Sequence, residues 1–245
     1  MSVVAMPGTT TPVAMPDTIR SLKYEIDMTN NIPPEYNGIP ITNTAISYSS
    51  TEEAGDFTSI GGLNADLSSV LSETGSITVI CKFKYAPGIL FHIGGTTTKG
   101  EAFGIDIGDA TIVGAVMYLY TWANDNTYLM TDLNLGTGWN EIRAVYDKDA
   151  IDPDRLILYL NGLRQVPNNI NTAKRTIDLT NNRTLFVGYR VYQGQNQSYW
   201  SGYMKYLKVY PGIPKLKIKR KLYFTNNKTS YFIPPIGIYD DNQLK

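Results

Sequence analysis

The sequence predicts an all-β protein, and three observations lead to this prediction. The chain has 18 tyrosines among its 245 residues, and Tyr, Thr, Val and Ile are enriched in strands. Its 21 glycines and 13 prolines often separate apolar segments, where they favour turns. Short apolar segments recur about every ten residues, which is typical of a β-sandwich or a β-barrel.

The strands are expected in one central region, residues 56–211. The clearest segment is SITVICKFKY, in which Ile77, Val79, Cys81 and Phe83 alternate with more polar residues and so face one way. Further strands are expected in the segments that begin at residues 88, 103, 111, 127, 139, 155, 175, 183 and 199. One short helical turn is expected in NADLSSVLSE, residues 64–73.

The two ends of the chain differ from this centre. Residues 1–55 are rich in Pro, Thr, Ser and Asn, and they predict an extended N-terminal arm that donates a strand near its end. Residues 212–245 predict a basic strand followed by a Pro-rich C-terminal arm. Neither end has enough apolar residues to fold alone. We expect both arms to lie on the central domain or on a neighbouring chain.

Charge and cysteine content exclude several classes of protein. The formal net charge is +0, which argues against nucleic-acid binding by the whole surface. The first residues lack the basic start and continuous apolar stretch of a signal peptide, and we expect neither export nor a membrane span, which needs ~20 apolar residues. The single cysteine, Cys81, precludes an intrachain disulfide and is expected to pack as a small buried hydrophobe.

Four segments carry a resemblance to a known family. They are WNEIRAVYD, RLILYLNGLRQV, RTLFVGY and YWSGYMKYLKVYP, in this order, and their order resembles the concanavalin A-like, laminin-G-like jelly-roll superfamily. The matching positions are Trp139, Tyr146, Tyr159, Asn161, Gly162, Val187, Gly188, Gly202, Leu207, Val209 and Tyr210. The resemblance implies a two-sheet antiparallel jelly-roll sandwich over residues 56–211, with extended N- and C-terminal arms.

Several of these positions carry their own structural expectations. Asn161-Gly162 between two apolar runs predicts a hairpin with a type I′ turn, which needs positive φ at both residues. Gly188 and Gly202 are expected where a strand bends or meets a neighbour closely. Trp139 is expected to fill the space between the two sheets.

The chain does not match the hydrolases of this superfamily, which carry closely spaced acids of the form E-x-D-x-x-E. Asp106 and Asp109 have odd spacing and so fall on opposite faces of a regular strand. Glu141 and Asp147 share a face but would lie ~20 Å apart, too far for a glycosidase pair. The single histidine, His92, is expected to be a hydrogen-bonded strand residue. We therefore expect no enzymatic activity.

A glycan is the expected ligand of the jelly roll, because aromatic rings and amides in edge loops suit sugar binding. Two loops, 118–128 and 192–200, combine both residue types. The candidate residues are Tyr192, Gln195, Asn196, Gln197, Tyr199, Trp200, Trp122 and Asn124. The alternative for the second loop, a polar hairpin held by aromatic core anchors, stays open.

Two charged segments suggest other ligands. The loop with Asp147, Asp149, Asp152 and Asp154 offers the hard oxygen ligands that suit Ca²⁺, the one cofactor the sequence suggests, and it is also typical of a solvated turn. The basic strand with Lys215, Lys217, Lys219, Arg220 and Lys221 suits docking onto an acidic partner. It also suits a solvated edge that blocks strand pairing.

The layout of arm, domain and arm resembles virion structural proteins of phages or large viruses. This implies a non-enzymatic decoration, fibre or tail protein, assembled into a virion in the host cytoplasm. Its arms would bind neighbouring subunits in a homo-oligomer or lattice, and its jelly roll would bind surface glycans. The alternative is a free carbohydrate-binding lectin or a degenerate glycanase. Neither a membrane nor nucleic acid is the expected partner.

Overall fold

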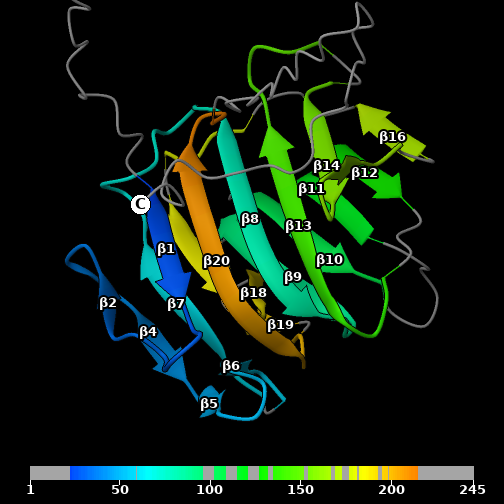
Figure 1. The fold of residues 1–245 in the computed structure, drawn as a ribbon. Helices are drawn as coiled ribbons and strands as arrows, with labels where there is room; N and C mark the ends of the chain where they lie inside the picture. Colours follow the sequence, from blue (N-terminus) through cyan, green and yellow to red (C-terminus); the bar gives the residue numbers. More distant parts are fainter. Residues whose placement is uncertain are drawn as a thin grey trace, which may run out of the picture.

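The computed structural model describes residues 23–214 with short gaps, and its secondary structure there is entirely β (Figure 1). The gaps are residues 59, 96–101, 109–114, 121–126, 132–134, 152–153, 167–168, 173–176, 181, 193–194 and 198, and side chains are not described for 115–120, 127–131, 169–172, 192 and 197. The described part contains no helix long and apolar enough to cross a membrane. The predicted all-β class is confirmed.

Two antiparallel sheets form the molecule, and the front sheet in Figure 1 is built around β8 and β20. Its strands, in spatial order, are β15 (Leu163–Arg164), β14 (Leu156–Leu160), β13 (Trp139–Tyr146), β8 (Ile77–Lys84), β20 (Tyr203–Pro211), β6 (Ala54–Asp56) and β5 (Ser47–Ser49). A further strand, β1 (Tyr24–Asp27), pairs with the later part of β20.

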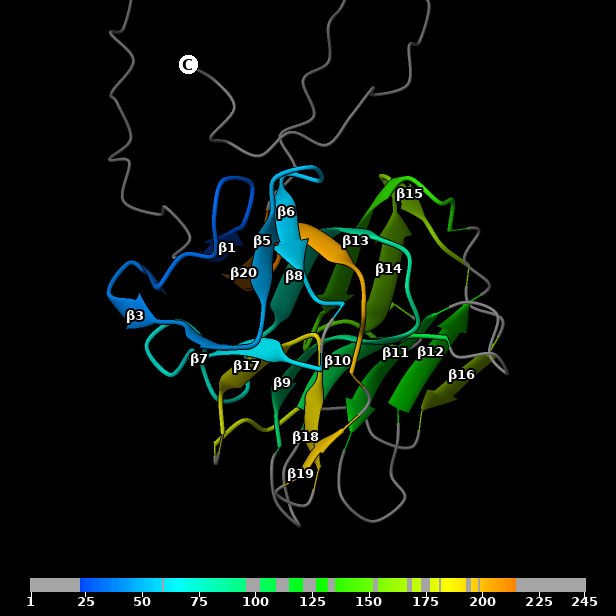
Figure 2. The same ribbon diagram turned by 90° about the horizontal axis from the view of Figure 1, so that it is seen from below.

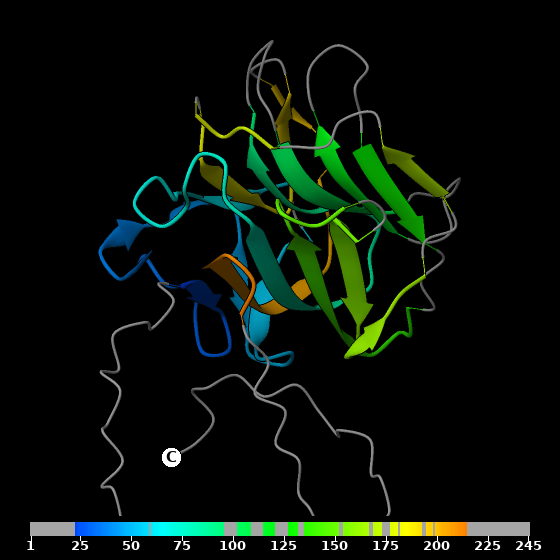
Figure 3. The same cartoon turned by 90° about the horizontal axis from the view of Figure 1, so that it is seen from above.

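The back sheet lies behind the front sheet, so that the two form a sandwich (Figures 2 and 3). Its strands, in spatial order, are β16 (Asn169–Thr172), β12 (Thr127–Thr131), β11 (Ala115–Tyr120), β10 (Ala102–Ile107), β9 (Gly88–Gly94), β17 (Thr184–Val187), β7 (Gly62–Asp66) and β4 (Thr42–Thr44). Two small hairpins complete the fold: β2 (Glu35–Tyr36) with β3 (Ile39–Pro40), and β18 (Arg190–Tyr192) with β19 (Gln195–Gln197).

The sandwich begins at Tyr24 rather than at residue 56, because the segment assigned to the N-terminal arm supplies strands to both sheets. β1, β5 and β6 join the front sheet and β4 joins the back sheet. Tyr24, Ile26 and Met28 alternate along the chain and are fully buried, which explains why this segment pairs with β20 instead of extending away. Residues 1–22 and 215–245, the remainder of the two predicted arms, lie outside the described residues.

The core follows from strand alternation. On β8, Ile77, Val79, Cys81 and Phe83 are almost completely buried, as the sequence predicts, and Cys81 is a free, buried thiol. The segment 64–73 contains the end of β7 and then a single turn, in which the amide of Leu71 donates to the carbonyl of Leu67 at 2.8 Å.

Trp200 is the largest side chain that the core buries completely. Its ring lies 5.2 Å from that of Phe57 and 6.3 Å from that of Phe83, and its Nε1 donates a 2.9 Å hydrogen bond to the carbonyl of Ala86. A Cβ on Gly202 would lie only 2.4 Å from the indole. Glycine is therefore required there, as predicted.

The two tryptophans exchange the roles that the sequence suggests for them. Trp200 was expected in a glycan site, but it has no exposed surface, so a glycan cannot reach it. Trp139 was expected between the sheets, but it is half-buried at the start of β13. The sequence predictions for both residues are therefore wrong.

The turn at Asn161-Gly162 is confirmed. Both residues have positive φ, 49° and 81°, as a type I′ turn requires, and they connect β14 to β15. The Asn161 side chain accepts a 2.8 Å hydrogen bond from the amide of Glu141, which fixes the hairpin to β13. Gly188 also has positive φ, 82°, and its α-carbon faces Phe57, as expected of a close approach.

We predict that Trp200→Ala lowers the free energy of unfolding by about 3–5 kcal/mol, the usual cost of removing a buried tryptophan. Trp139→Ala is the matched control and should cost about 1 kcal/mol, because its ring is half-buried and loses only surface contacts. Denaturant unfolding followed by circular dichroism measures both values. Equal costs for the two variants would contradict the placement of Trp200 in the core.

Candidate functional site

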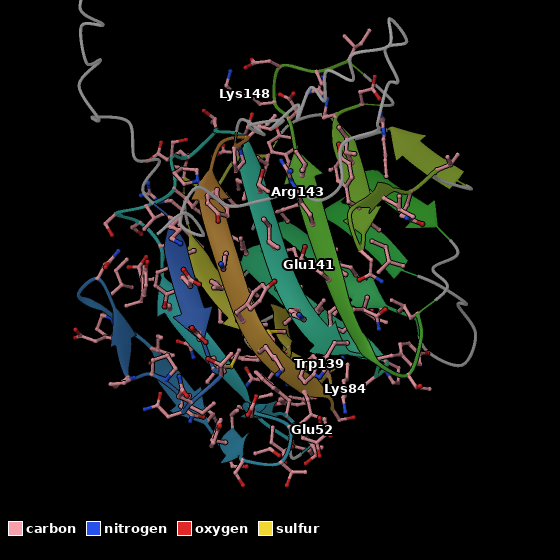
Figure 4. All side chains as sticks on the ribbon, viewed as in Figure 1. Glu52, Lys84, Trp139, Glu141, Arg143 and Lys148 are labelled. Atoms are coloured by element: carbon pink, nitrogen blue, oxygen red, sulfur yellow. The ribbon has the colours of Figure 1, made fainter. Side chains whose placement is uncertain are left out.

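The outer face of the front sheet, which points away from the back sheet, carries a row of charged and aromatic side chains. Along β13, Ile142 and Ala144 point into the core, so the alternate residues Trp139, Glu141 and Arg143 lie on the outer face (Figure 4). This alternation follows from strand geometry. The row extends down the strand toward Lys84 and Glu52 at one end.

Neighbouring strands add further side chains by register. On β8, Lys84 lies opposite Trp139, Lys82 opposite Glu141 and Ile80 opposite Arg143. On β14, Tyr159 lies opposite Arg143. The outer face is thus a continuous surface that spans three adjacent strands.

β20 contributes through an irregularity in its register. The pairing with β8 shifts between Met204 and Tyr206. Met204 and Leu207 are both buried in the core, so the two consecutive residues Lys205 and Tyr206 both lie between them on the half-buried side. A bulge of this kind redirects side chains, and here it brings Lys205 to Trp139.

Two lysines cover the indole of Trp139. The ammonium of Lys205 lies 4.8 Å and that of Lys84 5.5 Å from the ring centroid, within the range of cation–π attraction. Each lysine also pairs with a glutamate: Lys84 with Glu52 at 2.6 Å, and Lys205 with Glu53 at 3.6 Å. We call these five residues the Trp139 cluster.

The middle of the outer face is a hydrogen-bonded pair. The hydroxyl of Tyr206 donates to the carboxylate of Glu141, and the ammonium of Lys208 lies 4.9 Å from the Tyr206 ring. Burial raises the pKa of Tyr206, and the negative charge of Glu141 raises it further. Tyr206 therefore stays protonated at neutral pH and acts as a donor. Glu25 on β1 forms an ion pair with Lys208, with 3.2 Å between the charged atoms.

Arg143 occupies the opposite end of the row and is the most deeply buried charge on this face. Its side chain is only 6 % exposed, and its guanidinium lies 5.5 Å from the ring of Tyr159. Burial lowers its pKa from the usual arginine value, yet arginine keeps its charge in proteins at any physiological pH.

The loop 192–200 is held in place by its aromatic residues. Tyr199 is half-buried and stacks on Tyr189, with 5.9 Å between the ring centroids, and Trp200 is in the core. This agrees with the alternative of aromatic anchors that the sequence left open. Gln195 and Asn196 are exposed on β19, so they remain candidates for binding a ligand. The side chains of Tyr192 and Gln197, and all of Trp122 and Asn124, lie outside the described residues.

The acidic residues of the loop after β13 form hydrogen bonds and ion pairs with neighbouring residues. Asp147 accepts from the amide of Asp149 at 3.0 Å, Asp149 pairs with Lys148, and Asp154 pairs with Arg164. Within the described part of the chain, no three His, Cys, Asp or Glu side chains are grouped to hold a metal. Asp152 lies outside that part, and the calcium site stays a prediction.

The basic strand at Lys215, Lys217, Lys219, Arg220 and Lys221 also lies outside the described residues. Docking of an acidic partner there stays a prediction. Of the outer-face residues, the sequence analysis singled out Trp139, Glu141 and Tyr159, and for other roles. The signal that could have found the face is WNEIR, in which Trp139, Glu141 and Arg143 alternate with residues suited to the core.

His92 belongs to β9 in the back sheet and is 3 % exposed. Its Nε2 lies 3.3 Å from the carbonyl of Gly95, and its ring lies 5.9 Å from that of Phe186. Burial lowers its pKa to about 4, and the positive charge of Arg190 acts in the same direction. His92 is therefore a neutral, buried strand residue at neutral pH.

Comparison with known proteins shows only distant likenesses. No family model matches the chain, and no curated protein matches it significantly. Among solved structures, it is similar to the CBM40 of the Ruminococcus gnavus IT-sialidase bound to α2,3-sialyllactose, at 18% identity, 59% of this chain, 79% of that chain and a TM-score of 0.45. It is also similar to domain 4 of AbnA, a GH43 extracellular arabinanase from Geobacillus stearothermophilus, in complex with arabinotriose, at 14% identity, 78% of this chain, 82% of that chain and a TM-score of 0.45.

A third likeness is to the NanB sialidase from Streptococcus pneumoniae, at 17% identity and a TM-score of 0.45. It covers 62% of this chain but only 25% of that one. All three scores are below 0.5, so we draw nothing about ligand or activity from these likenesses.

We predict that His92 makes the folded state less stable as the pH falls. An unfolded histidine has a pKa of ~6.5, above the folded value of about 4, so the unfolded state binds more protons between these pH values. The contribution of His92 is complete above pH ~6.5 and is lost toward pH ~4, by up to about 3 kcal/mol. In His92→Gln this part of the pH dependence should disappear.

Urea unfolding of both proteins between pH 7 and pH 4.5 measures the effect. The carboxylates titrate similarly in both proteins, so the difference between the two curves isolates His92. Parallel curves would show that His92 is not buried as a neutral group.

Proposed function

We propose that this protein is a non-enzymatic binding module, and that its outer face binds a glycan at the Trp139 cluster. The observation that supports this proposal is the half-buried indole of Trp139 on the solvent side of the front sheet, surrounded by two lysines and their glutamates. The sandwich does not need an aromatic ring there, because its core lies on the other side of β13.

The chemistry of the cluster suits a polyhydroxylated ligand. An aromatic ring offers an apolar plane to the C–H groups of a sugar, while a few polar groups fix its orientation. Lysine ammonium groups donate hydrogen bonds and glutamate carboxylates accept them. Sugar hydroxyls do both, so they can replace the contacts between Lys84 and Glu52 and between Lys205 and Glu53.

A ligand needs little free energy to move the two lysines away from their glutamates and from the indole. Ion pairs near the surface contribute only about 0–1 kcal/mol, and lysine heads can move into water while their stems stay in contact with apolar surface. The Glu53 side chain is 70% exposed, so its pair with Lys205 is the weaker restraint. A sugar ring can displace both ammonium groups from the indole at this cost.

In this proposal Glu141 takes part in binding and not in hydrolysis. It is the carboxylate nearest the middle of the face, and it accepts a hydrogen bond from Tyr206. A glycosidase needs two carboxyl groups on opposite sides of the scissile bond, ~5–9.5 Å apart. The role of Glu141 in this proposal is that of an acceptor for a ligand hydroxyl.

The role as a virion subunit stays a prediction. It depends on arms at residues 1–22 and 215–245, which lie outside the described residues. A free lectin with the same outer face is the alternative. The presence of the chain in purified particles, together with protection of both ends from protease, would favour the virion role.

We predict that Trp139→Ala weakens glycan binding at least tenfold, which corresponds to about 1.4 kcal/mol. A glycan array identifies the ligand, and isothermal titration calorimetry then compares the affinities. Tyr85→Ala is the matched control, because Tyr85 is a 49 % exposed tyrosine that follows β8, and it should bind normally.

A second variant tests the alternative site. If Asn196→Ala abolishes binding and Trp139→Ala does not, the glycan binds at the β18–β19 hairpin and the proposal for the outer face is wrong. If no glycan on the array binds the unmodified protein, the proposed function itself fails.

A further inference from the structure

Arg143 is a buried charge that forms no ion pair with any residue the structure describes. Its side chain is 6 % exposed, and its Nε is buried without a hydrogen-bond partner. Within the described part of the chain, no carboxylate lies within ion-pair distance of its guanidinium. Among the described residues, the guanidinium packs over the ring of Tyr159, 5.5 Å from the ring centroid.

The nearest acid on the same strand forms no ion pair with Arg143, although its negative charge favours the charged guanidinium. Glu141 lies two residues away on the same face, but its carboxylate accepts from the Tyr206 hydroxyl. Lys82 and Lys208 lie on β8 and β20 on the same side of the sheet, so the charges that neighbour Arg143 there are mixed. Fold stability does not explain the guanidinium, because a buried, unpaired charge is destabilising.

The surroundings of Arg143 restrict what can approach it. Tyr159 packs against the guanidinium from β14, and Ile80 lies opposite on β8. Val145 follows two residues later on the same face and is 2 % exposed. Tyr210 and Glu141 also act on the guanidinium electrostatically, but the apolar side chains beside it exclude water, and such a setting strengthens a charge-assisted hydrogen bond. It therefore favours a small anionic group over a large one.

We propose that Arg143 anchors an anion site on the outer face, and that this site binds the carboxylate of an acidic saccharide. The planar guanidinium matches a carboxylate with two parallel N–H···O bonds, and the unpartnered Nε supplies one of the two donors. The saccharide part of this inference rests on the proposed function; the anion site itself does not.

The anion site and the Trp139 cluster are separate parts of one surface. Trp139 and Arg143 are four residues apart on β13, which is ~13 Å along a strand. Glu141 and Tyr206 lie between them. A ligand that reaches both must extend along the strand, with its acidic group at Arg143 and a neutral ring at Trp139.

The test is the thermal unfolding of the full chain with D-glucuronate, D-glucose or sodium acetate, at constant ionic strength. A ligand that binds only the folded state raises the Tm. We expect D-glucuronate to raise the Tm of the unmodified protein and to leave that of Arg143→Met unchanged. Arg164→Met is the matched control, because Arg164 is exposed and already paired with Asp154, and its Tm should rise normally.

The Tm values without ligand provide a second readout. Replacing a buried, unpaired charge with an apolar side chain of similar length is neutral or stabilising, so Arg143→Met should unfold at the same temperature or higher. If Arg143 instead has a purely structural role, the variant should unfold several degrees lower while D-glucuronate shifts both proteins equally. That result, or no shift in the unmodified protein, would overturn the proposal.

The other outcomes of these experiments separate this inference from the proposed function. If acetate raises the Tm as much as D-glucuronate does, the saccharide part of the inference is overturned and an anion site remains. Loss of neutral glycan binding in Trp139→Ala, with the D-glucuronate shift unchanged, would show that the two sites act independently. If Trp139→Ala has no effect but Arg143→Met abolishes the shift, the proposed function fails and the anion site stands.

Discussion

The packing of Trp200 against glycine backbones is the constraint on which the rest of the structure depends. The indole contacts Phe57 and Phe83, and the main-chain amide of Trp200 donates a 2.8 Å hydrogen bond to the carbonyl of Gly188. Gly202 leaves room for the ring. Residues from several distant parts of the chain thus meet at one side chain, and they join the start of β20 to the back sheet.

This packing also determines which residues can face solvent. Once the core side of β8, β13 and β20 is fixed, the alternate side chains of each strand must lie on the outer face. The bulge after Met204 adds one further residue there, which is how Lys205 reaches Trp139. The candidate site is therefore a consequence of the core packing, although none of its residues belongs to the core.

The sequence predicts the parts of the fold that depend on local chemistry. Alternation identifies the buried side of β8, and Asn161-Gly162 identifies a hairpin because few other residues adopt positive φ at both positions. It does not predict the roles of Trp139 and Trp200, because both have aromatic and polar neighbours, and their orientation depends on distant strands. The short strands β4, β5 and β6 contain few apolar residues, so pairing partners far along the chain decide their structure.

The central claim is that the outer face, and not the 192–200 loop, contacts the ligand. The chain has 3 tryptophans, so the indole N–H signals in a ¹H–¹⁵N NMR spectrum can be assigned from single Trp→Phe variants. Titration with a glycan selected from the array should shift the Trp139 indole signal and leave that of Trp200 unchanged. If the amides of Gln195 and Asn196 shift while the Trp139 indole does not, the account of the outer face is contradicted.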